Sequence, residues 1–312
     1  MIGSLKSQFN NWELIIVDDG STDDSLALAI EVIQTAGQNV RLLSSPINEG
    51  RGRALKNGID AAVGDIIVTT EVDCSWGLNI VKDLTTELIN THCHVVIASP
   101  HLPDGGMVNV PLHRRMLSRL GNKLISMFFR SGVTMNTGMT RAYKREVIQP
   151  LLTRENGKEF HLEVLLKLTV LQFRISEIPA VLTWLDSKLS RSNSTAPRKS
   201  STKLFKTIMS HLVFIGIAQP LFVFGVLFGA SLMIGVNFVG YAIVQLLVGQ
   251  PSAFYSIIGL LMILYALIFF GFSVLFYQLR EVLRESWTKY YEVNQLPNRK
   301  TARDLSSDLH NP

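Results

Sequence analysis

The feature that most constrains this chain is a long stretch without an ionisable side chain. From Leu212 to Leu279 the sequence contains no Lys, Arg, Asp, Glu or His. About 20 apolar residues are enough for one helix to cross a bilayer. We therefore predict two transmembrane helices, near 221–247 and 255–278, joined at 250–252. The alternative is a buried hairpin inside a soluble core, but the remaining chain is too small to enclose one.

Basic residues on both sides of these spans predict their orientation. The flanking residues are Arg198, Lys199, Lys203, Lys206, Arg280, Arg284 and Lys289. Because positive charge favours the cytoplasmic side, we expect an integral membrane protein with a cytoplasmic N-terminal domain, a juxtamembrane segment at 201–220 and a cytoplasmic tail at 280–312. The net charge of +5 suits a surface held against an anionic lipid bilayer. No clustered basic and aromatic pattern indicates nucleic acid.

The spans also contain several glycines, at positions 225, 229, 235 and 240. Small residues let membrane helices approach closely. A homo-oligomer formed through the transmembrane helices is therefore one expectation for this chain.

Apolar runs alternate with helical patterns in the first part of the chain. The strands are expected at 13–17, 40–44, 66–70 and 94–99, and the helices between them at 24–36, 51–63 and 77–90. Continuously apolar strands that alternate with helices are typical of a parallel sheet covered on both faces. We therefore predict an α/β domain over 1–200, with a mostly parallel sheet.

Acidic residues follow two of these strands. Asp18 and Asp19 follow the first, and Glu71 and Asp73 follow the third. Ligands of such sheets bind outside the carboxyl ends of the strands. Carboxylates one residue apart can hold a hard divalent cation that bridges phosphates, and carboxylates can also accept hydrogen bonds from hydroxyl and ring N–H groups. The alternative is that these acids only make the loops soluble.

Six segments resemble family 2 glycosyltransferases, and most closely the dolichyl-phosphate mannose synthase group. They are NWELIIVDDGSTDDS, NEGRGRALKNGIDAAVGDIIV, EVDCS, TGMTRAYKREV, KEFHLEVLLKL and RKSSTKL, and they lie within about residues 8–204. The resemblance implies a GT-A (Rossmann-like) fold. It also implies inverting transfer of a sugar from a nucleotide diphosphate sugar to a polyprenyl phosphate.

The resemblance also implies roles for individual residues. The nucleotide-sugar site would comprise Asp18, Asp19, Gly20, Ser21, Asn48, Gly50, Arg51, Lys56, Glu71, Asp73, Arg198 and Lys203. The acceptor phosphate would meet Arg114, Arg115, Arg119, Thr137 and Arg141. Asp73 and Arg141 would be catalytic, and Asp73 with Glu71 would hold Mg²⁺ or Mn²⁺.

The sequence departs from the family pattern at three places. Glu71 replaces the first Asp of the metal motif, and Met135 stands where the family has an acid. The family's first strand and its Pro-x-Tyr-Asn-Glu turn would precede Met1. Either the true start lies upstream or the chain is a degenerate copy, and we favour the upstream start because the other segments are complete.

The pattern of 111–132 indicates a basic amphipathic helix, which suits a lipid interface, although an ordinary surface helix would show the same pattern. Three other functions compete with the leading one. They are a family 2 transferase with a diacylglycerol or polysaccharide acceptor, an inactive membrane scaffold, and a channel or transporter subunit. The last is disfavoured because neither span contains an ionisable residue.

Overall fold

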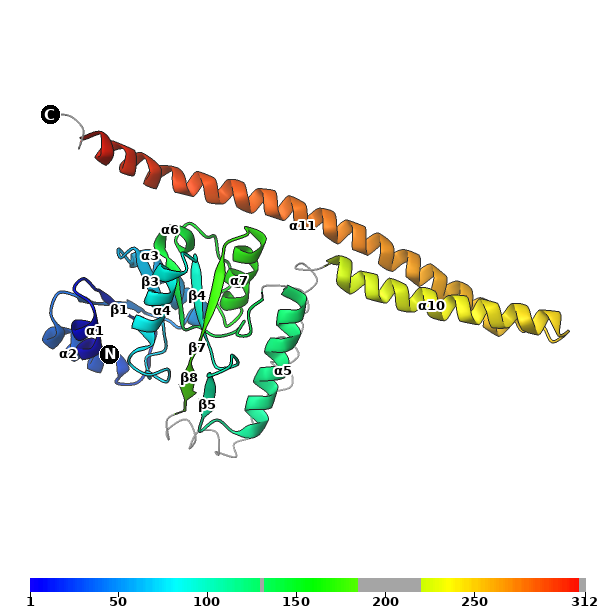
Figure 1. Ribbon diagram of the computed structural model, residues 1–312, viewed down its shortest axis with the longest axis horizontal. Coiled ribbons are helices and arrows are strands. Elements are labelled where there is room, and N and C mark those ends of the chain that lie inside the picture. Colours follow the sequence, from blue (N-terminus) through cyan, green and yellow to red (C-terminus); the bar gives the residue numbers. More distant parts are fainter. Residues whose placement is uncertain (130–131, 185–219, 309–312) are drawn as a thin grey trace. The chain divides into compact units, whose positions relative to one another are not determined.

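The computed structural model describes residues 1–129, 132–184 and 220–308 (Figure 1). The chain forms two compact units. The globular unit comprises Met1–Ser201 together with Trp287–Pro312, and the helical unit comprises Thr202–Ser286. Arg198, Lys203 and most of the predicted juxtamembrane segment, 201–219, lie outside the described residues.

The globular unit alternates strands and helices along most of its length. The strands are β1 Leu14–Asp19, β2 Val40–Ser45, β3 Ile66–Thr69, β4 Val95–Ser99, β5 Gly106–Val108, β6 Arg141–Lys144, β7 Ile175–Pro179 and β8 Val181–Thr183. The helices are α1 Ile2–Gln8, α2 Ser25–Ala36, α3 Arg51–Ala61, α4 Ile80–Asn90, α5 Leu112–Phe129, α6 Arg145–Ile148 and α7 Phe160–Val170. All four predicted strands and all three helices between them are present, with ends shifted by a few residues.

The strands pair in three groups. β1 and β2 form a parallel pair, β5 and β8 form another, and the remaining four strands form a sheet in the order β3-β6-β4-β7. β4 and β7 are parallel, whereas β6 runs antiparallel to both β3 and β4. The sequence pattern did not predict β6, which separates two strands that would otherwise be neighbours.

Helices cover both faces of the four-stranded sheet, as predicted. Val95 and Ile97 of β4 belong to a core with α3 and α7, whereas Val96 and Ala98 belong to a core with α4. Side chains alternate between the two faces of a strand. All four are buried because each face has a helical layer against it, which explains the continuously apolar sequence of β4.

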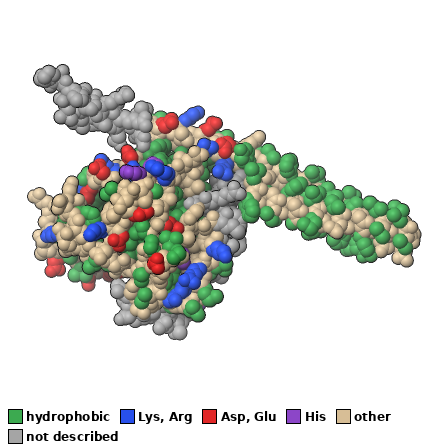
Figure 2. Space-filling view, in the orientation of Figure 1, with side chains coloured by type: hydrophobic (Ala, Val, Ile, Leu, Met, Phe, Trp, Pro, Cys, Tyr) green, Lys and Arg blue, Asp and Glu red, His purple; other side chains and the backbone are tan. Residues whose placement is uncertain are grey.

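The helical unit contains α10, Pro220–Leu247, and most of α11, Ala253–Asp308. Both helices are long and apolar enough to cross a membrane, and only 6% and 17% of their most apolar windows are buried. Figure 2 shows hydrophobic side chains along the surface of this hairpin. Such exposed apolar surface is expected of helices whose solvent is lipid.

A close glycine contact joins the two apolar helices. A Cβ atom added to Gly235 would lie 3.0 Å from the carbonyl oxygen of Gly259, and one added to Gly259 would lie 2.9 Å from the backbone nitrogen of Val239. Gly235 therefore packs inside the hairpin, so we no longer assign it to contact with a second copy. Added Cβ atoms at Gly225, Gly229 and Gly240 would meet nothing within 4 Å.

Candidate functional site

Asp18 and Asp19, which were expected to follow the first strand, are the last two residues of β1, and the turn after the strand holds Asp18 in place. The carboxylate of Asp18 accepts hydrogen bonds from the hydroxyl and backbone N–H of Ser21 and from the Ser44 hydroxyl at 3.0 Å. The bond from the Ser21 side chain is the main cause that lowers the pKa of Asp18 below its ordinary value, against the opposing effect of burial. Asp18 therefore stays ionised at neutral pH. The hydroxyl residue that follows the acid in the sequence, Ser21, is needed because it donates to the Asp18 carboxylate.

The second acid joins this turn to the start of α3. The Asp19 carboxylate accepts hydrogen bonds from the backbone N–H groups of Glu49, at 2.9 Å, and Gly50, at 3.0 Å. A Cβ atom on Gly20 would lie 2.5 Å from the Ile47 carbonyl carbon and 2.6 Å from the Asn48 nitrogen. Only glycine allows the two loops to approach so closely, so Asp19 and Gly20 together fix the loop at 47–50.

The start of α3 is held from its other side by a loop at 154–157. The carbonyl oxygen of Asn156 accepts from the N–H groups of Gly52 at 2.7 Å and Arg53 at 3.3 Å. These are N–H groups that a helix leaves without an intrahelical partner. Arg51 is exposed at this helix start. Lys56 lies further along α3 and forms an ion pair of 2.6 Å with Asp60.

The other predicted acids follow β3. One Glu71 carboxylate oxygen accepts from the Ser75 hydroxyl at 3.0 Å and the Trp76 indole N–H at 3.3 Å. Asp73 accepts from the Ser75 backbone N–H at 3.0 Å. Both acids are half-buried. Among the described residues, no group of three His, Cys, Asp or Glu side chains could hold a metal ion.

Arg141 has a different environment from the one predicted. It is fully buried, and its guanidinium donates to the carbonyl oxygens of Gly138 at 2.8 Å, Asn136 at 2.6 Å and His161 at 3.2 Å. A phosphate contact requires an accessible guanidinium. We therefore revise the role of Arg141 from phosphate binding to positioning of the loop at 136–140, where Thr137 is exposed.

His161 lies beside Arg141 at the start of α7. Its side chain is 2% exposed, and neither ring nitrogen has a hydrogen-bond partner in the described part of the chain. Burial, followed by the charges of Arg141 and Arg51, lowers the pKa of His161 well below its ordinary value. The ring is therefore neutral at neutral pH.

Helix α5 presents the predicted basic side chains in three different ways. Arg114 lies over the Trp184 ring at 5.3 Å, Arg115 donates to the Val110 carbonyl oxygen at 3.4 Å, and Arg119 is exposed. Exposed apolar residues accompany them at Leu112, Met116, Leu117 and Leu120. The predicted amphipathic helix is present, with apolar side chains facing outward.

Two acids that are not among the predicted site residues hold the surrounding loops. Glu177 of β7 accepts from the N–H groups of Thr134 at 2.6 Å and Met135 at 2.8 Å. Glu163 of α7 accepts from the N–H groups of Arg154 and Glu155 at 2.9 Å. A signal did exist for Glu163, because Lys167 lies one helical turn further on. The burial of the pair could not be predicted.

Gly50→Ala should disrupt the loop between Asp19 and α3. Gly50 has φ +108°, and an added Cβ atom would lie 2.5 Å from the Asn156 carbonyl oxygen. Backbone strain and overpacking together should cost about 2–5 kcal/mol, which thermal unfolding in detergent would measure. Gly121→Ala in α5 is the matched control, since nothing lies within 4 Å of its added Cβ atom. An equal loss in both variants would contradict this interpretation.

An α/β domain with acids after its strands is typical of proteins that bind nucleotides. Residues 1–152 match the sequence profile of the family described as glycosyl transferase family 2. This match covers just under half of the chain, which is therefore similar to that family over these residues, and the α/β fold class predicted from the sequence is confirmed.

Several characterised proteins are similar to this chain. A glycosyltransferase, AglD, of Haloferax volcanii is 26% identical over 54% of this chain and 27% of its own length. Polyprenol monophosphomannose synthase of Mycolicibacterium smegmatis is 26% identical over 58% of this chain and 71% of its own length. Undecaprenyl-phosphate 4-deoxy-4-formamido-L-arabinose transferase of Pectobacterium atrosepticum is 27% identical over 45% of this chain and 41% of its own length. The chain thus spans under two thirds of two of these relatives.

Among solved structures, glucosyl-3-phosphoglycerate synthase from Mycobacterium tuberculosis, in complex with Mn²⁺, UDP-glucose and phosphoglyceric acid, is also similar. It has a TM-score of 0.46 and 20% identity over 69% of this chain and 73% of its own.

Proposed function

We propose that this protein transfers a sugar from a nucleotide diphosphate sugar to a polyprenyl phosphate at the cytoplasmic face of a membrane. The observation that most supports this is the acidic edge of the sheet, formed by Asp18 and Asp19, whose carboxylates accept hydrogen bonds from Ser44 and from the loop before α3. The same chain also has two apolar helices long enough to cross a membrane. Two of the similar proteins are named for polyprenol or undecaprenyl-phosphate chemistry. This supports the choice of acceptor.

In this proposal the donor lies at the acidic edge. Asp18, Asp19, Ser21, Asn48 and Arg51 would surround the nucleotide. The proposal assigns Arg198 and Lys203, which lie outside the described residues, to the same site. Lys56 is less suited to it, because its ammonium group already pairs with Asp60 further along α3.

The acids after β3 suit a divalent cation. Asp73 and Glu71 offer only oxygen ligands, and Mg²⁺ in such sites is usually held by one or two carboxylates plus substrate phosphates. When bound, Mg²⁺ or Mn²⁺ would neutralise charge on the departing diphosphate. Asp73 is the stronger candidate ligand, because it keeps the aspartate that the family's metal motif has at this position, whereas Glu71 replaces the motif's other aspartate with a longer side chain.

The remaining chemistry needs little from the protein. The acceptor phosphate oxygen is already anionic near neutral pH, so its attack on the anomeric carbon does not require a general base. The domain must hold donor and acceptor in line. The exposed Arg119, together with Arg114 and Arg115, would meet the acceptor phosphate, and the apolar side of α5 would lie in the lipid interface.

The test is transfer of radiolabelled sugar from a panel of nucleotide sugars, with membranes that contain the full chain. Prenyl phosphate and diacylglycerol serve as competing acceptors, with and without EDTA. We expect label in the prenyl phosphate product, lost with EDTA and restored by Mg²⁺ or Mn²⁺. Label in diacylglycerol would favour the alternative lipid acceptor, and no product with any donor would favour the scaffold.

A further inference from the structure

The C-terminal part of α11 belongs to the globular unit and contacts it through three aromatic residues, Trp287, Tyr290 and Tyr291, which we call the aromatic patch. The Tyr291 hydroxyl donates to the Glu146 carbonyl oxygen at 2.7 Å, and its ring meets the Phe173 ring at 5.3 Å. The Trp287 ring centroid lies 5.2 Å from the Lys167 ammonium nitrogen. The patch thus covers α7 and the segments beside it.

Lys167 is one half of a buried ion pair. Its ammonium group lies 2.6 Å from the Glu163 carboxylate, and the two side chains are 6% and 7% exposed. Lys167 also donates to the Leu152 carbonyl oxygen. Trp287 therefore covers a charge that has little contact with water, where a cation–π contact is strongest.

This ion pair holds the loop that supports the donor site. Glu163 accepts from the N–H groups of Arg154 and Glu155, and the next residue, Asn156, accepts from the first N–H groups of α3. The N–H of Gly50, just before α3, donates to Asp19. An unbroken series of contacts therefore joins Trp287 to the acidic edge.

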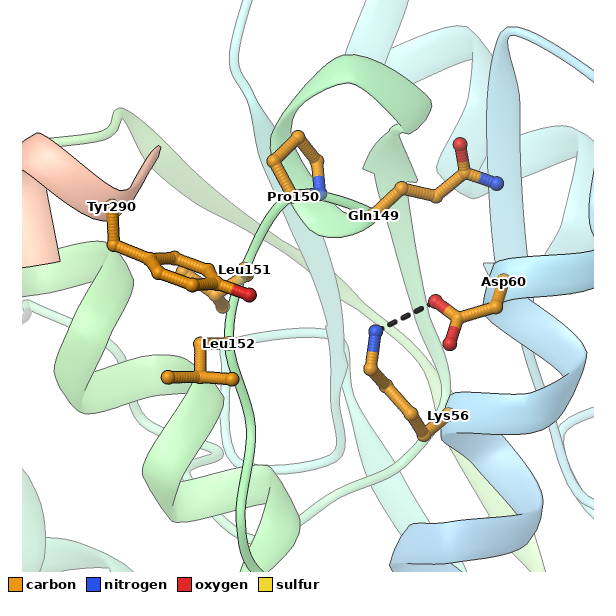
Figure 3. Close-up of a pocket in the computed structure, with 7 residues that line it drawn as sticks. All are labelled: Lys56, Asp60, Gln149, Pro150, Leu151, Leu152 and Tyr290. Carbon is orange, nitrogen blue, oxygen red and sulfur yellow. Dashed lines mark hydrogen bonds and ion pairs between the residues drawn. The ribbon is translucent and has the colours of Figure 1, made fainter. Parts of the chain in front are cut away.

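The third residue of the aromatic patch, Tyr290, lies near α3. It lines a pocket of about 390 Å³ with Lys56, Asp60, Gln149, Pro150, Leu151 and Leu152. Figure 3 shows the Tyr290 ring beside Leu151 and Leu152, across the pocket from the Lys56–Asp60 ion pair. The aromatic patch therefore also lies beside Leu152, in the loop that Glu163 and Lys167 hold, and beside α3, whose first N–H groups that loop accepts from.

We propose that the aromatic patch, and Trp287 in particular, positions the donor site through the Lys167–Glu163 pair and the loop at 152–156. This loop runs from Leu152, whose carbonyl oxygen accepts from Lys167, to Asn156, whose carbonyl oxygen accepts from the start of α3. Trp287 is a positioning residue and not a catalytic one, because it would act on the donor site through its contact with Lys167. This inference rests on the proposed function. It predicts that losing the Trp287 ring weakens donor binding and leaves the acceptor site and the chemical step unchanged.

The experiment compares Trp287→Ala with Trp287→Phe and Val293→Ala in the full chain. Trp287→Phe keeps an aromatic face for Lys167, and Val293 is 62% exposed on the same helix. For Trp287→Ala we expect the donor KM to rise about five- to tenfold, with kcat and acceptor KM unchanged. Trp287→Phe should recover most of the donor affinity, and Val293→Ala should match the parent protein.

Hydrogen exchange of the 152–156 amides in the same proteins separates this inference from the proposed function. Faster exchange in Trp287→Ala alone supports the positioning role, even if the parent protein transfers no sugar to any acceptor. Unchanged exchange, or equal changes in kcat and both KM values, would overturn it. Loss of transfer in the parent protein with normal exchange effects would overturn only the proposed function.

Discussion

Asp73→Asn should lower the rate of sugar transfer by about a hundred- to a thousandfold, the usual effect of losing one group that stabilises charge in a transition state. The substitution keeps the size of the side chain and its ability to accept from the Ser75 N–H at 3.0 Å. It removes the negative charge that would hold a divalent cation near the diphosphate. Initial rates over a series of Mg²⁺ concentrations would measure the loss.

Glu71→Gln is the matched control for Asp73→Asn. It removes one negative charge from the same loop and can still accept from Ser75 and Trp76. We expect it to lower the rate less than tenfold, because these two bonds hold Glu71 to its own loop. If Glu71→Gln were the more damaging change, the assignment of Asp73 as the main metal ligand would be wrong.

Glu163→Gln should lower the free energy of unfolding by about 3–5 kcal/mol, since breaking a buried ion pair leaves the partner charge without compensation. The Lys167 and Glu163 side chains are 6% and 7% exposed, so water cannot replace the lost partner. The amide would also place a donor group among the N–H groups of Arg154 and Glu155. Thermal unfolding of the detergent-solubilised chain would detect this change.

The chain contains a matched pair of the same spacing at its surface. Lys56 and Asp60 are also one helical turn apart, and their side chains are 23% and 50% exposed. Asp60→Asn should therefore cost only about 0.3–0.5 kcal/mol. Similar losses in Glu163→Gln and Asp60→Asn would mean that burial does not determine the strength of these pairs in this protein.

Local patterns were sufficient to predict the elements that are regular and apolar. Strands such as Val95–Ser99 are buried on both faces, and α10 consists almost entirely of apolar residues, so hydrophobicity alone identifies them. β6, Arg141–Lys144, has a charged residue at each end and pairs with strands more than 40 residues away. Nothing in its local sequence predicts that a charged residue is completely buried.

In the candidate site, too, features set by local sequence could be predicted and features set by distant contacts could not. The turn at Asp18 follows a recognisable pattern of strand end, acid, glycine and hydroxyl, and its acid lies where that pattern predicts. The support given by Trp287 depends on its contact with Lys167, which is more than 100 positions away in the chain. Such contacts are set by tertiary packing, which a single sequence does not specify.

The globular unit is discontinuous in the chain, and this has a consequence for its biosynthesis. Residues 1–201 leave the ribosome first, and the aromatic patch follows only after Thr202–Ser286, which include both apolar helices. At typical translation speeds this interval lasts roughly 5–15 s. During that time the nascent domain lacks the ring that covers Lys167. The domain can therefore complete its packing only after the hairpin has been synthesised, and truncation before Trp287 would not yield the whole domain.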